Sequence, residues 1–201
     1  NDDDDDGFEM FVHEIEILGA FDNPFILKLF GFSIQEPYII ATPYISGGSL
    51  YDYVSSSSDR KALSPTENTI IAIGISYGMM KLHEMKIVHR DLKSANILLD
   101  ENKLPIICDF GISRAIASTM TKDIGTTNWM APEQMASGSY DEKVDVYAFG
   151  CILFEMIARS MPFEELTSLK VAAEVMKGNR PKAPHRHKRI RMIIKLCWEQ
   201  D

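Results

Sequence analysis

Two polar motifs that flank a short apolar hairpin narrow the possible folds of this chain more than any other feature. The first motif is His-Arg-Asp-Leu-Lys-Ser-Ala-Asn at 89–96, and the second is Asp-Phe-Gly at 109–111. The apolar runs 97–99 and 104–108 lie between them, separated by a polar turn, which predicts two antiparallel strands. Because a hairpin returns the chain on itself, we expect Asp91, Asn96 and Asp109 to meet at one edge of a cleft.

The composition is that of an ordinary globular protein, with 45% apolar and 25% charged residues among 201. A net charge of -8 argues against nucleic acid as a partner. Much of this charge comes from the run Asp2 to Asp6. Such a run repels itself and stays solvated, so we expect a flexible loop or tail, with an acidic docking segment as the alternative.

The chain shows no membrane span and no secretory signal. Its longest apolar stretches, 69–80 and 148–154, are too short to cross a bilayer. Its three cysteines lie far apart and lack the spacing of zinc ligands, which favours a reduced, intracellular and cytoplasmic location. Cys108 precedes Asp109, so it is either a reactive thiol in the cleft or a buried small side chain, and we favour the second.

Helical spacing and start signals predict one helix and two strands at the N-terminal end, followed by a mostly helical remainder. Ser49 with Asp52, and Ser64 with Glu67, have the spacing of capping boxes. Asp141 can cap a helix that is apolar nearly all round, which indicates burial. The predicted helices cover 8–21, a short stretch after 49, 65–83, 141–159, 164–177 and 187–199, and the predicted strands cover 26–32 and 38–41.

The order of these motifs, with Ala-Pro-Glu at 131–133 after them, resembles the catalytic loop, metal-binding turn and activation-segment end of eukaryotic protein kinases. The resemblance implies an α+β, bilobal fold. Residues 1–42 would be the remnant of a truncated N-lobe, 43–48 the hinge, and 49–201 a mainly helical C-lobe.

The resemblance also implies a catalytic set that uses ATP and Mg²⁺ to phosphorylate a protein. Asp91 would be the base that orients the acceptor hydroxyl, and Lys93 would neutralise charge on the transferred phosphate. Asn96 and Asp109 would hold the magnesium, which prefers hard oxygen ligands.

The linker and the hairpin would form the adenine site. By the resemblance, Thr42 is the gatekeeper and Leu98 the floor under the purine, while the linker backbone at Pro43, Tyr44 and Ile45 meets the adenine edge. Proline at 43 departs from the usual acidic residue, but it retains the carbonyl that the adenine amino group needs.

Further residues would have structural or regulatory roles in the family. The resemblance implies that His89 and Phe110 stack with Leu18 and Leu29 above Asp145, and that Glu14 pairs with a strand lysine. Arg90 implies control by activation-loop phosphorylation, in which a phosphate pairs with the guanidinium. The remaining positions are Gly111 of the metal-binding turn, Glu133 of the Ala-Pro-Glu motif, and the candidate phosphosites Ser118, Thr119 and Thr121.

Lys93 and Thr126 resemble serine/threonine kinases rather than tyrosine kinases, so we expect a serine or threonine acceptor on a protein substrate. Trp129-Met130 and Cys197-Trp198 resemble the tyrosine-kinase-like branch. The oligomeric state is not predicted.

Two family elements are not found. There is no G-x-G-x-x-G, and residues 1–27 contain no lysine. The arginine that would pair with Glu133 is expected beyond 201. We therefore expect a fragment of a kinase domain with little activity alone. The alternative is a truncated pseudokinase that acts as a scaffold, which the intact Asp91, Asn96 and Asp109 argue against.

Overall fold

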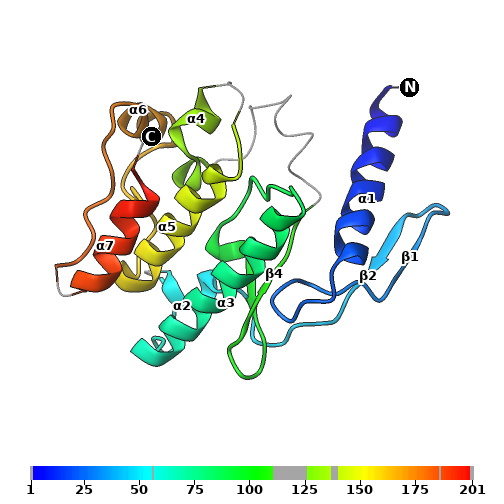
Figure 1. The fold of residues 1–201 in the computed structure, drawn as a ribbon, viewed down its shortest axis with the longest axis horizontal. Coiled ribbons are helices and arrows are strands. Elements are labelled where there is room, and N and C mark those ends of the chain that lie inside the picture. The colour runs from blue at the N-terminus through cyan, green and yellow to red at the C-terminus, as the bar shows by residue number, and fades with distance from the viewer. Residues whose placement is uncertain (1, 56, 111–125, 137–139, 186, 200–201) are drawn as a thin grey trace.

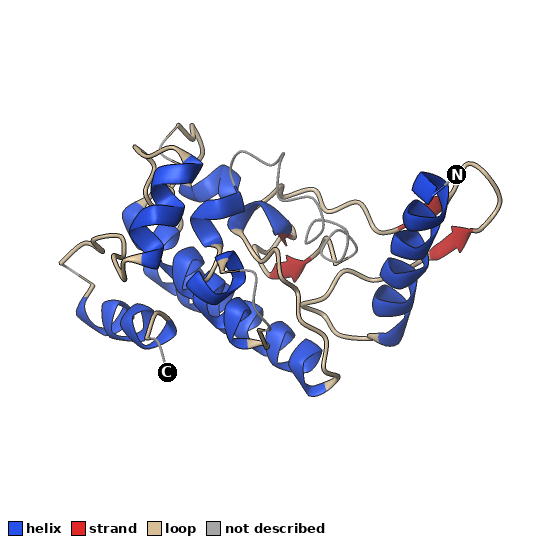
Figure 2. Cartoon of the chain, turned by 90° about the horizontal axis from the view of Figure 1, so that it is seen from above, coloured by secondary structure: helices blue, strands red, loops and turns tan. Residues whose placement is uncertain are grey.

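In the computed structural model, the described residues are 2–55, 57–110, 126–136, 140–185 and 187–199. Helix α1 (Asp2–Ala20) and the strands β1 (Gly31–Ser33) and β2 (Ile39–Ala41) lie together at one end of the molecule, and the helical remainder lies at the other (Figures 1 and 2). This arrangement confirms the predicted α+β fold, with one helix and two strands in the N-terminal part. The boundaries drawn at 42, 43 and 48 stay a prediction.

Helix α1 begins earlier than predicted. The flexible loop predicted for Asp2 to Asp6 is wrong, since these residues form the first turns of the helix. At the other end of the helix, Ile17 and Leu18 are buried and anchor it.

The N-terminal strands are shorter than predicted. β1 and β2 pair antiparallel over three residues each, with Gly31 opposite Ala41. The preceding stretch instead reaches the hairpin, because Ile26 forms a bridge with Ile107 and the Leu27 N–H donates to the Ile107 carbonyl at 2.9 Å. The strand predicted for 26–32 is therefore divided between two partners.

The hairpin between the two polar motifs is confirmed. The 3-10 helix η1 (Ser94–Asn96) leads into β3 (Ile97–Leu99), which pairs antiparallel with β4 (Pro105–Ile107). Ile97 lies opposite Ile107, and both are fully buried.

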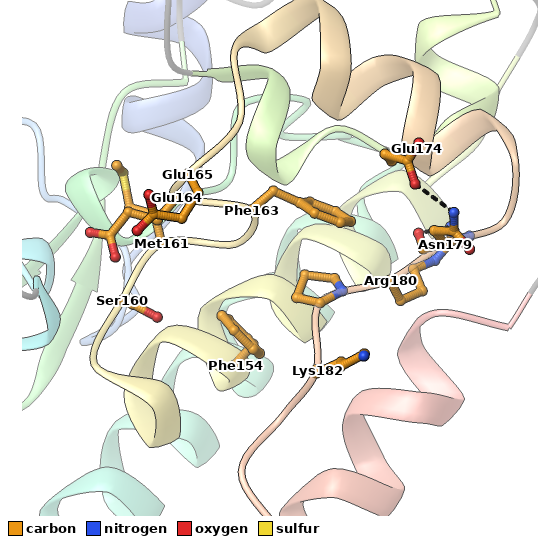
Figure 3. Close-up of a pocket in the computed structure, with 11 residues that line it drawn as sticks. Phe154, Ser160, Met161, Phe163, Glu164, Glu165, Glu174, Asn179, Arg180 and Lys182 are labelled. Atoms are coloured by element: carbon orange, nitrogen blue, oxygen red, sulfur yellow. Dashed lines mark hydrogen bonds between the residues drawn. The ribbon is translucent and has the colours of Figure 1, made fainter.

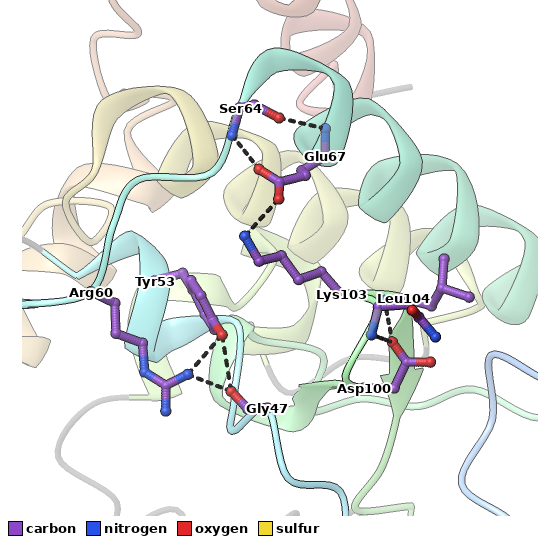
Figure 4. A network of polar contacts seen from close by, with 9 residues as sticks. Gly47, Tyr53, Arg60, Ser64, Glu67, Asp100, Lys103 and Leu104 are labelled. Atoms are coloured by element: carbon purple, nitrogen blue, oxygen red, sulfur yellow. Dashed lines mark hydrogen bonds and ion pairs between the residues drawn. The ribbon is translucent and has the colours of Figure 1, made fainter.

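The predicted capping box at the start of α3 (Pro65–Glu84) is present. The Glu67 N–H donates to Ser64 Oγ at 3.2 Å, and the Ser64 N–H donates to Glu67 Oε2 at 2.6 Å. Lys103 in the hairpin turn pairs with the other Glu67 oxygen at 2.6 Å (Figure 4). The capping box therefore also fixes the hairpin turn against α3.

A second set of polar contacts ties the end of the linker to α2 (Tyr51–Val54). The Tyr53 hydroxyl and Arg60 Nη1 both donate to the Gly47 carbonyl, at 3.2 and 2.5 Å (Figure 4). The predicted bonds between Ser49 and Asp52 are present, although the helix itself begins at Tyr51.

Helix α5 (Lys143–Ala158) passes through the middle of the helical part and packs against α3 and α7 (Lys188–Cys197). It is buried on almost all sides, as predicted. Asp141 does not cap it directly, but its Oδ1 accepts from the Lys143 N–H at 2.9 Å. The 3-10 helix η3 (Thr126–Trp129), α4 (Pro132–Met135) and α6 (Ser168–Met176) complete this part. The last two predicted helices, 164–177 and 187–199, are longer than the observed α6 and α7.

In the portions of the chain that the structure describes, no helix has both the length and the apolar character needed to cross a membrane.

Candidate functional site

The hairpin brings the ends of both polar motifs to one edge. The Cys108 N–H donates to the Asn96 carbonyl at 3.0 Å, so Asp109 follows directly after a residue paired with Asn96. His89 Nε2 lies 3.1 Å from the Cys108 carbonyl, which fixes the first motif against the second. Asp91, Asn96 and Asp109 therefore gather at this edge from two segments of the chain.

The two oxygens of Asp91 have different surroundings. Oδ2 lies 2.8 Å from Lys93 Nζ and 3.0 Å from Asn96 Nδ2, and the same amide also donates to the Asp91 carbonyl at 2.9 Å. Oδ1 is buried and has no hydrogen-bond partner among the described residues. Because a buried polar atom is normally paired, an unpaired carboxylate oxygen held by a fixed neighbour is suited to accept a proton from a bound hydroxyl.

Asp109 presents an exposed carboxylate close to a second acid. Burial, and then the charge of Asp109, raise the pKa of Glu14 on α1 above its ordinary value. Both Arg90 (φ 69°) and Asp109 (φ 63°) adopt a left-handed backbone conformation, which costs energy for residues other than glycine. Strain of this kind gathers at functional sites, and two neighbouring acids favour binding of a cation.

The donors at this edge fit magnesium in their chemistry. Since Asn96 Nδ2 is committed to Asp91, its Oδ1 is left for another partner, and Asp109 adds a carboxylate. The described residues contain no group of three or more His, Cys, Asp or Glu side chains that could hold a metal ion. Magnesium keeps several waters and takes substrate phosphates as ligands, so two protein oxygens suffice where a nucleotide supplies others.

The linker leads directly to β3. The Leu99 N–H donates to the Gly48 carbonyl at 2.8 Å, and Ser49 forms a bridge with Leu98. A Cβ on Gly47 would lie 2.1 Å from the Leu99 carbonyl oxygen, so only glycine permits this approach.

The predicted adenine-site residues occupy this linker and the strand beside its end. Leu98 is half-buried beside the end of the linker, and Thr42, Pro43 and Ile45 are half-buried along it. The Tyr44 side chain is 92% exposed, which leaves its backbone as the part suited to a ligand.

The predicted stack is partly visible. The His89 and Phe110 rings lie 5.1 Å apart between centroids, and both residues are buried, as is Leu18. Leu29 is half-buried, with its Cδ2 3.7 Å from the position of a Cβ on Gly19 in α1. These positions are compatible with the predicted stack.

Asp145 on α5 binds the backbone of the first motif. Its carboxylate accepts from the backbone N–H groups of His89 at 2.8 Å and Arg90 at 2.9 Å. His83 Nε2 lies 2.9 Å from the same carboxylate. His83 was not predicted, since nothing in its spacing distinguishes it from an ordinary residue in the last turn of α3.

Arg90, Glu133 and Thr126 are further positions with predicted regulatory or structural roles. The Arg90 guanidinium lies over the Tyr140 ring at 5.7 Å, and its carbonyl accepts from Gln134 Nε2 at 2.7 Å. Glu133 is exposed and Thr126 begins η3. Four predicted positions lie outside the described residues: Gly111, Ser118, Thr119 and Thr121.

The cysteines are free thiols, and the interpretation of Cys108 as a buried small side chain is confirmed. Burial, followed by the charges of Asp109 and Glu14, raises the pKa of Cys108 to about 12. A reactive cysteine needs a lowered pKa, so the alternative of a reactive thiol is wrong.

Sequence reasoning missed one buried acid next to this site. Glu155 on α5 is fully buried and accepts hydrogen bonds from Ser94 in η1 and Trp129 in η3. Burial raises the pKa of Glu155 to about 8, although both hydrogen bonds lower it. The available signal was an acid in the middle of a helix that is otherwise apolar nearly all round.

A cavity of about 620 Å³ lies elsewhere, between the C-terminal end of α5 and α6 (Figure 3). Phe154 and Phe163 contribute apolar surface, and Arg180 and Lys182 contribute charge. The Glu174 carboxylate at its rim accepts from Asn179 Nδ2 at 2.5 Å. None of the predicted site residues lines this cavity, so it is separate from the edge that carries Asp91.

Comparisons with known proteins agree with the motifs. A family model described as protein tyrosine and serine/threonine kinase matches residues 1–201. Similar proteins include serine/threonine-protein kinase STY46 of Arabidopsis thaliana, 37% identical over 196 residues, which are 95% of this chain and 34% of that protein. Serine/threonine-protein kinase CTR1 of the same plant is 37% identical over 199 residues, 95% of this chain and 24% of that protein.

RGS domain-containing serine/threonine-protein kinase A of Dictyostelium discoideum is 39% identical over 193 residues, 94% of this chain and 17% of that protein. The chain thus spans about a third or less of the length of these curated relatives.

Proposed function

Because the chain belongs to the protein tyrosine and serine/threonine kinase family, we propose that it transfers the γ-phosphate of ATP to a serine or threonine hydroxyl of a protein substrate. The observation that carries this proposal is the asymmetry of Asp91, whose Oδ2 is held by two partners while its buried Oδ1 has none among the described residues. The similarity to named serine/threonine kinases supports the choice of acceptor.

Asp91 acts as the base in this proposal. Its Oδ1 accepts a hydrogen bond from the acceptor hydroxyl and takes the proton as the oxygen attacks the phosphorus. Lys93 and Asn96 keep the carboxylate from rotating, since both contact Oδ2. The Lys93 ammonium also offsets negative charge as the phosphoryl group moves to the acceptor.

Asn96 Oδ1 and the Asp109 carboxylate would hold Mg²⁺ bound to the ATP phosphates. When bound, the ion would neutralise charge on the phosphate oxygens and orient the terminal phosphate. Asp109 is exposed and lies near Glu14, so two acidic side chains are close to the proposed metal position. The pairing of Glu14 with a lysine remains part of the proposal.

The adenine would lie between the linker and Leu98. The backbone of Pro43, Tyr44 and Ile45 offers carbonyl and N–H groups, and Thr42 directly precedes the linker. The bonds from Gly48 and Leu50 to β3 keep the linker close to Leu98. Residues 1–42, 43–48 and 49–201 correspond to the proposed N-lobe, hinge and C-lobe.

Regulation and location complete the proposal. Arg90 lies beside the base and is suited to pair with a phosphate on Ser118, Thr119 or Thr121. Thr126 supports the serine/threonine preference. The three free thiols agree with a reduced, cytoplasmic compartment.

Phosphoryl transfer by the full-length gene product that contains residues 1–201 tests this function. We expect Asp91→Asn to lower kcat by about 10²–10⁴-fold, the usual contribution of a general base. Asp109→Ala is expected to abolish transfer through lost metal binding. Asp22→Ala is a matched control, because that carboxylate is 94% exposed and pairs with Lys28 at a distance of 3.4 Å. An inactive wild type with intact nucleotide binding would favour a scaffold, and retained activity in Asp109→Ala would remove Asp109 from its role.

A further inference from the structure

Glu155 is a fully buried carboxyl group that joins two segments far apart in the sequence. Ser94 Oγ donates to Oε1 at 2.6 Å, and Trp129 Nε1 donates to Oε2 at 2.7 Å. Burying a carboxyl group is costly, and an apolar side chain would fill this position in an otherwise apolar helix. The acid therefore has a purpose beyond packing, which its two partners identify.

Both partners adjoin the proposed catalytic machinery. Ser94 directly follows Lys93 and lies in η1 with Asn96. Trp129 ends η3, just before the Ala-Pro-Glu motif. The segment 126–135 has a second attachment to the catalytic loop, because Gln134 Nε2 donates to the Arg90 carbonyl at 2.7 Å. The two attachments, at Arg90 and Ser94, lie on either side of Asp91 and Lys93.

We propose that Glu155 is a positioning residue that fixes the loop carrying Asp91 relative to the segment 126–131, and thereby sets reaction with the protein acceptor rather than binding of ATP. The proposal rests on the phosphoryl transfer proposed above. Asp91 Oδ1 is the atom assigned to the acceptor hydroxyl, and Asp91 lies between the two attachments in the sequence. The Glu155 bonds involve neither the linker 42–45 nor Leu98, where the nucleotide is placed.

Two substitutions of Glu155 separate hydrogen bonding from packing. The Trp129 N–H can only donate, whereas the Ser94 hydroxyl can donate or accept. In Glu155→Gln, the side-chain carbonyl accepts from Trp129 and the amide donates to Ser94, so both bonds are retained. Glu155→Leu has similar bulk and loses both. A residue that merely fills the core would tolerate leucine as well as glutamine.

Steady-state kinetics of the full-length gene product test the proposal. We expect Glu155→Leu to lower kcat/KM for a protein acceptor by about 10²-fold, the scale expected for a small misplacement of reacting groups, with the KM for ATP within about 2-fold of wild type. Glu155→Gln should recover most of this loss. Glu165→Leu, which changes an exposed acid in the loop after α5, is the control. Equal loss in Glu155→Leu and Glu155→Gln, or a parallel rise in the KM for ATP, would overturn the proposal.

Two variants that each remove one hydrogen-bond donor keep the proposal testable if Glu155→Leu does not fold. Ser94→Ala and Trp129→Phe each remove one bond. Each should lower kcat/KM for the protein acceptor less than Glu155→Leu does, and leave the KM for ATP unchanged. If kcat/KM for the protein acceptor is unchanged in both variants, the hydrogen bonds of Glu155 have no positioning role.

A readout that needs no catalysis separates this inference from the proposed function. The indole N–H resonance of Trp129, assigned by its loss in Trp129→Phe, should shift with pH near 8 in the wild type and lose this response in Glu155→Gln. Among the described residues, charged or titratable groups near this bridge include the Cys151 thiol one turn earlier on α5, which is also influenced by Arg180, and Lys93, which precedes Ser94. Inactive wild type with this titration would overturn the kinase function alone, and a shift near pH 8 that persists in Glu155→Gln would overturn the bridge.

Discussion

The proposed catalytic loop and the N-terminal strands are held in opposite ways. Two buried acids, Asp145 and Glu155, hold the loop 89–96. Asp145 accepts from two of its backbone N–H groups, and Glu155 accepts from the Ser94 hydroxyl. Strand β1 and the residues on either side of it instead expose large apolar side chains, with Phe30 68%, Phe32 54% and Ile34 61% exposed.

This contrast divides the proposed site into two parts: the loop and hairpin that carry Asp91, Asn96 and Asp109, which buried contacts hold in place, and the exposed strands β1 and β2. The groups assigned to the acceptor and the metal depend on contacts within the helical part, which are independent of β1 and β2. A contiguous exposed apolar face commonly marks a surface that another element covers. Substitutions in the two regions should therefore differ strongly in their effect on stability.

The largest effect is expected for Asp145→Ala. The substitution leaves two buried backbone N–H groups and His83 without their acceptor, so we expect the free energy of unfolding to fall by about 4 kcal/mol. Urea denaturation would measure the loss. Asp109→Asn is the matched control, since that residue is exposed and asparagine tolerates its positive φ, and it should change stability by less than about 0.5 kcal/mol. Similar losses in both variants would remove the distinction between buried and open acids.

A core truncation sharpens the comparison between the two regions. Ile152 on α5 is fully buried, and Ile152→Ala should cost about 3 kcal/mol through lost burial and a residual cavity. Phe32→Ser should stay within about 0.5 kcal/mol and reduce self-association. Thermal or urea unfolding with light scattering would test both. A loss for Phe32→Ser as large as that for Ile152→Ala would show that β1 is covered in solution.

The linker tests the boundary between the halves. In Gly47→Ala the new Cβ meets the Leu99 carbonyl oxygen, so the linker must move away from β3 at a cost of about 2 kcal/mol. Weaker nucleotide binding should accompany this loss. Gly7→Ala is the control, because a Cβ there meets nothing within 4 Å and alanine favours a helix by about 1 kcal/mol. Unchanged stability in Gly47→Ala would contradict the close approach.

The last prediction concerns the dependence of stability on pH. Burial raises the pKa of Glu155 from its ordinary value of 4.5 to about 8, so the native state binds more protons than the unfolded state between these values. Wild-type stability from this group therefore falls as pH rises from about 4.5 to about 8, by less than about 1.4 kcal/mol per pH unit. Glu155→Gln lacks this slope, so its advantage over wild type should grow with pH and level off above about 8. Denaturant titrations at several pH values would show parallel curves if Glu155 were ionised throughout.

Local features of the chain were predictable from sequence, and distant pairings were not. The hairpin at 97–107 and the Ser64 capping box depend on residues close in sequence, and both are present. The family motifs also pointed to Asp91, Asn96 and Asp109 as neighbours. Ile26, by contrast, pairs with Ile107, a choice that no local pattern reveals.

The supports of the site show the same limit. The contact of His83 with Asp145, and those of Glu155 with Ser94 and Trp129, depend on the packing of α3, α5 and the 3-10 helices, which the sequence does not reveal. The loop predicted for Asp2 to Asp6 is wrong for another reason, because the prediction weighed charge repulsion and not the helix that follows directly in the sequence.

Binding of Mn²⁺ with a nucleotide, measured by electron paramagnetic resonance on the full-length gene product, would separate the proposed metal ligands from the proposed base. If Asn96 and Asp109 hold the metal while Asp91 orients the acceptor, then Asn96→Ala and Asp109→Ala should each weaken Mn²⁺–nucleotide binding by at least about 10-fold. Asp91→Asn should bind within about 2-fold of wild type and yet fail to transfer phosphate. Tight Mn²⁺ binding by Asp109→Ala, or equal loss of binding in Asp91→Asn, would contradict this division of roles.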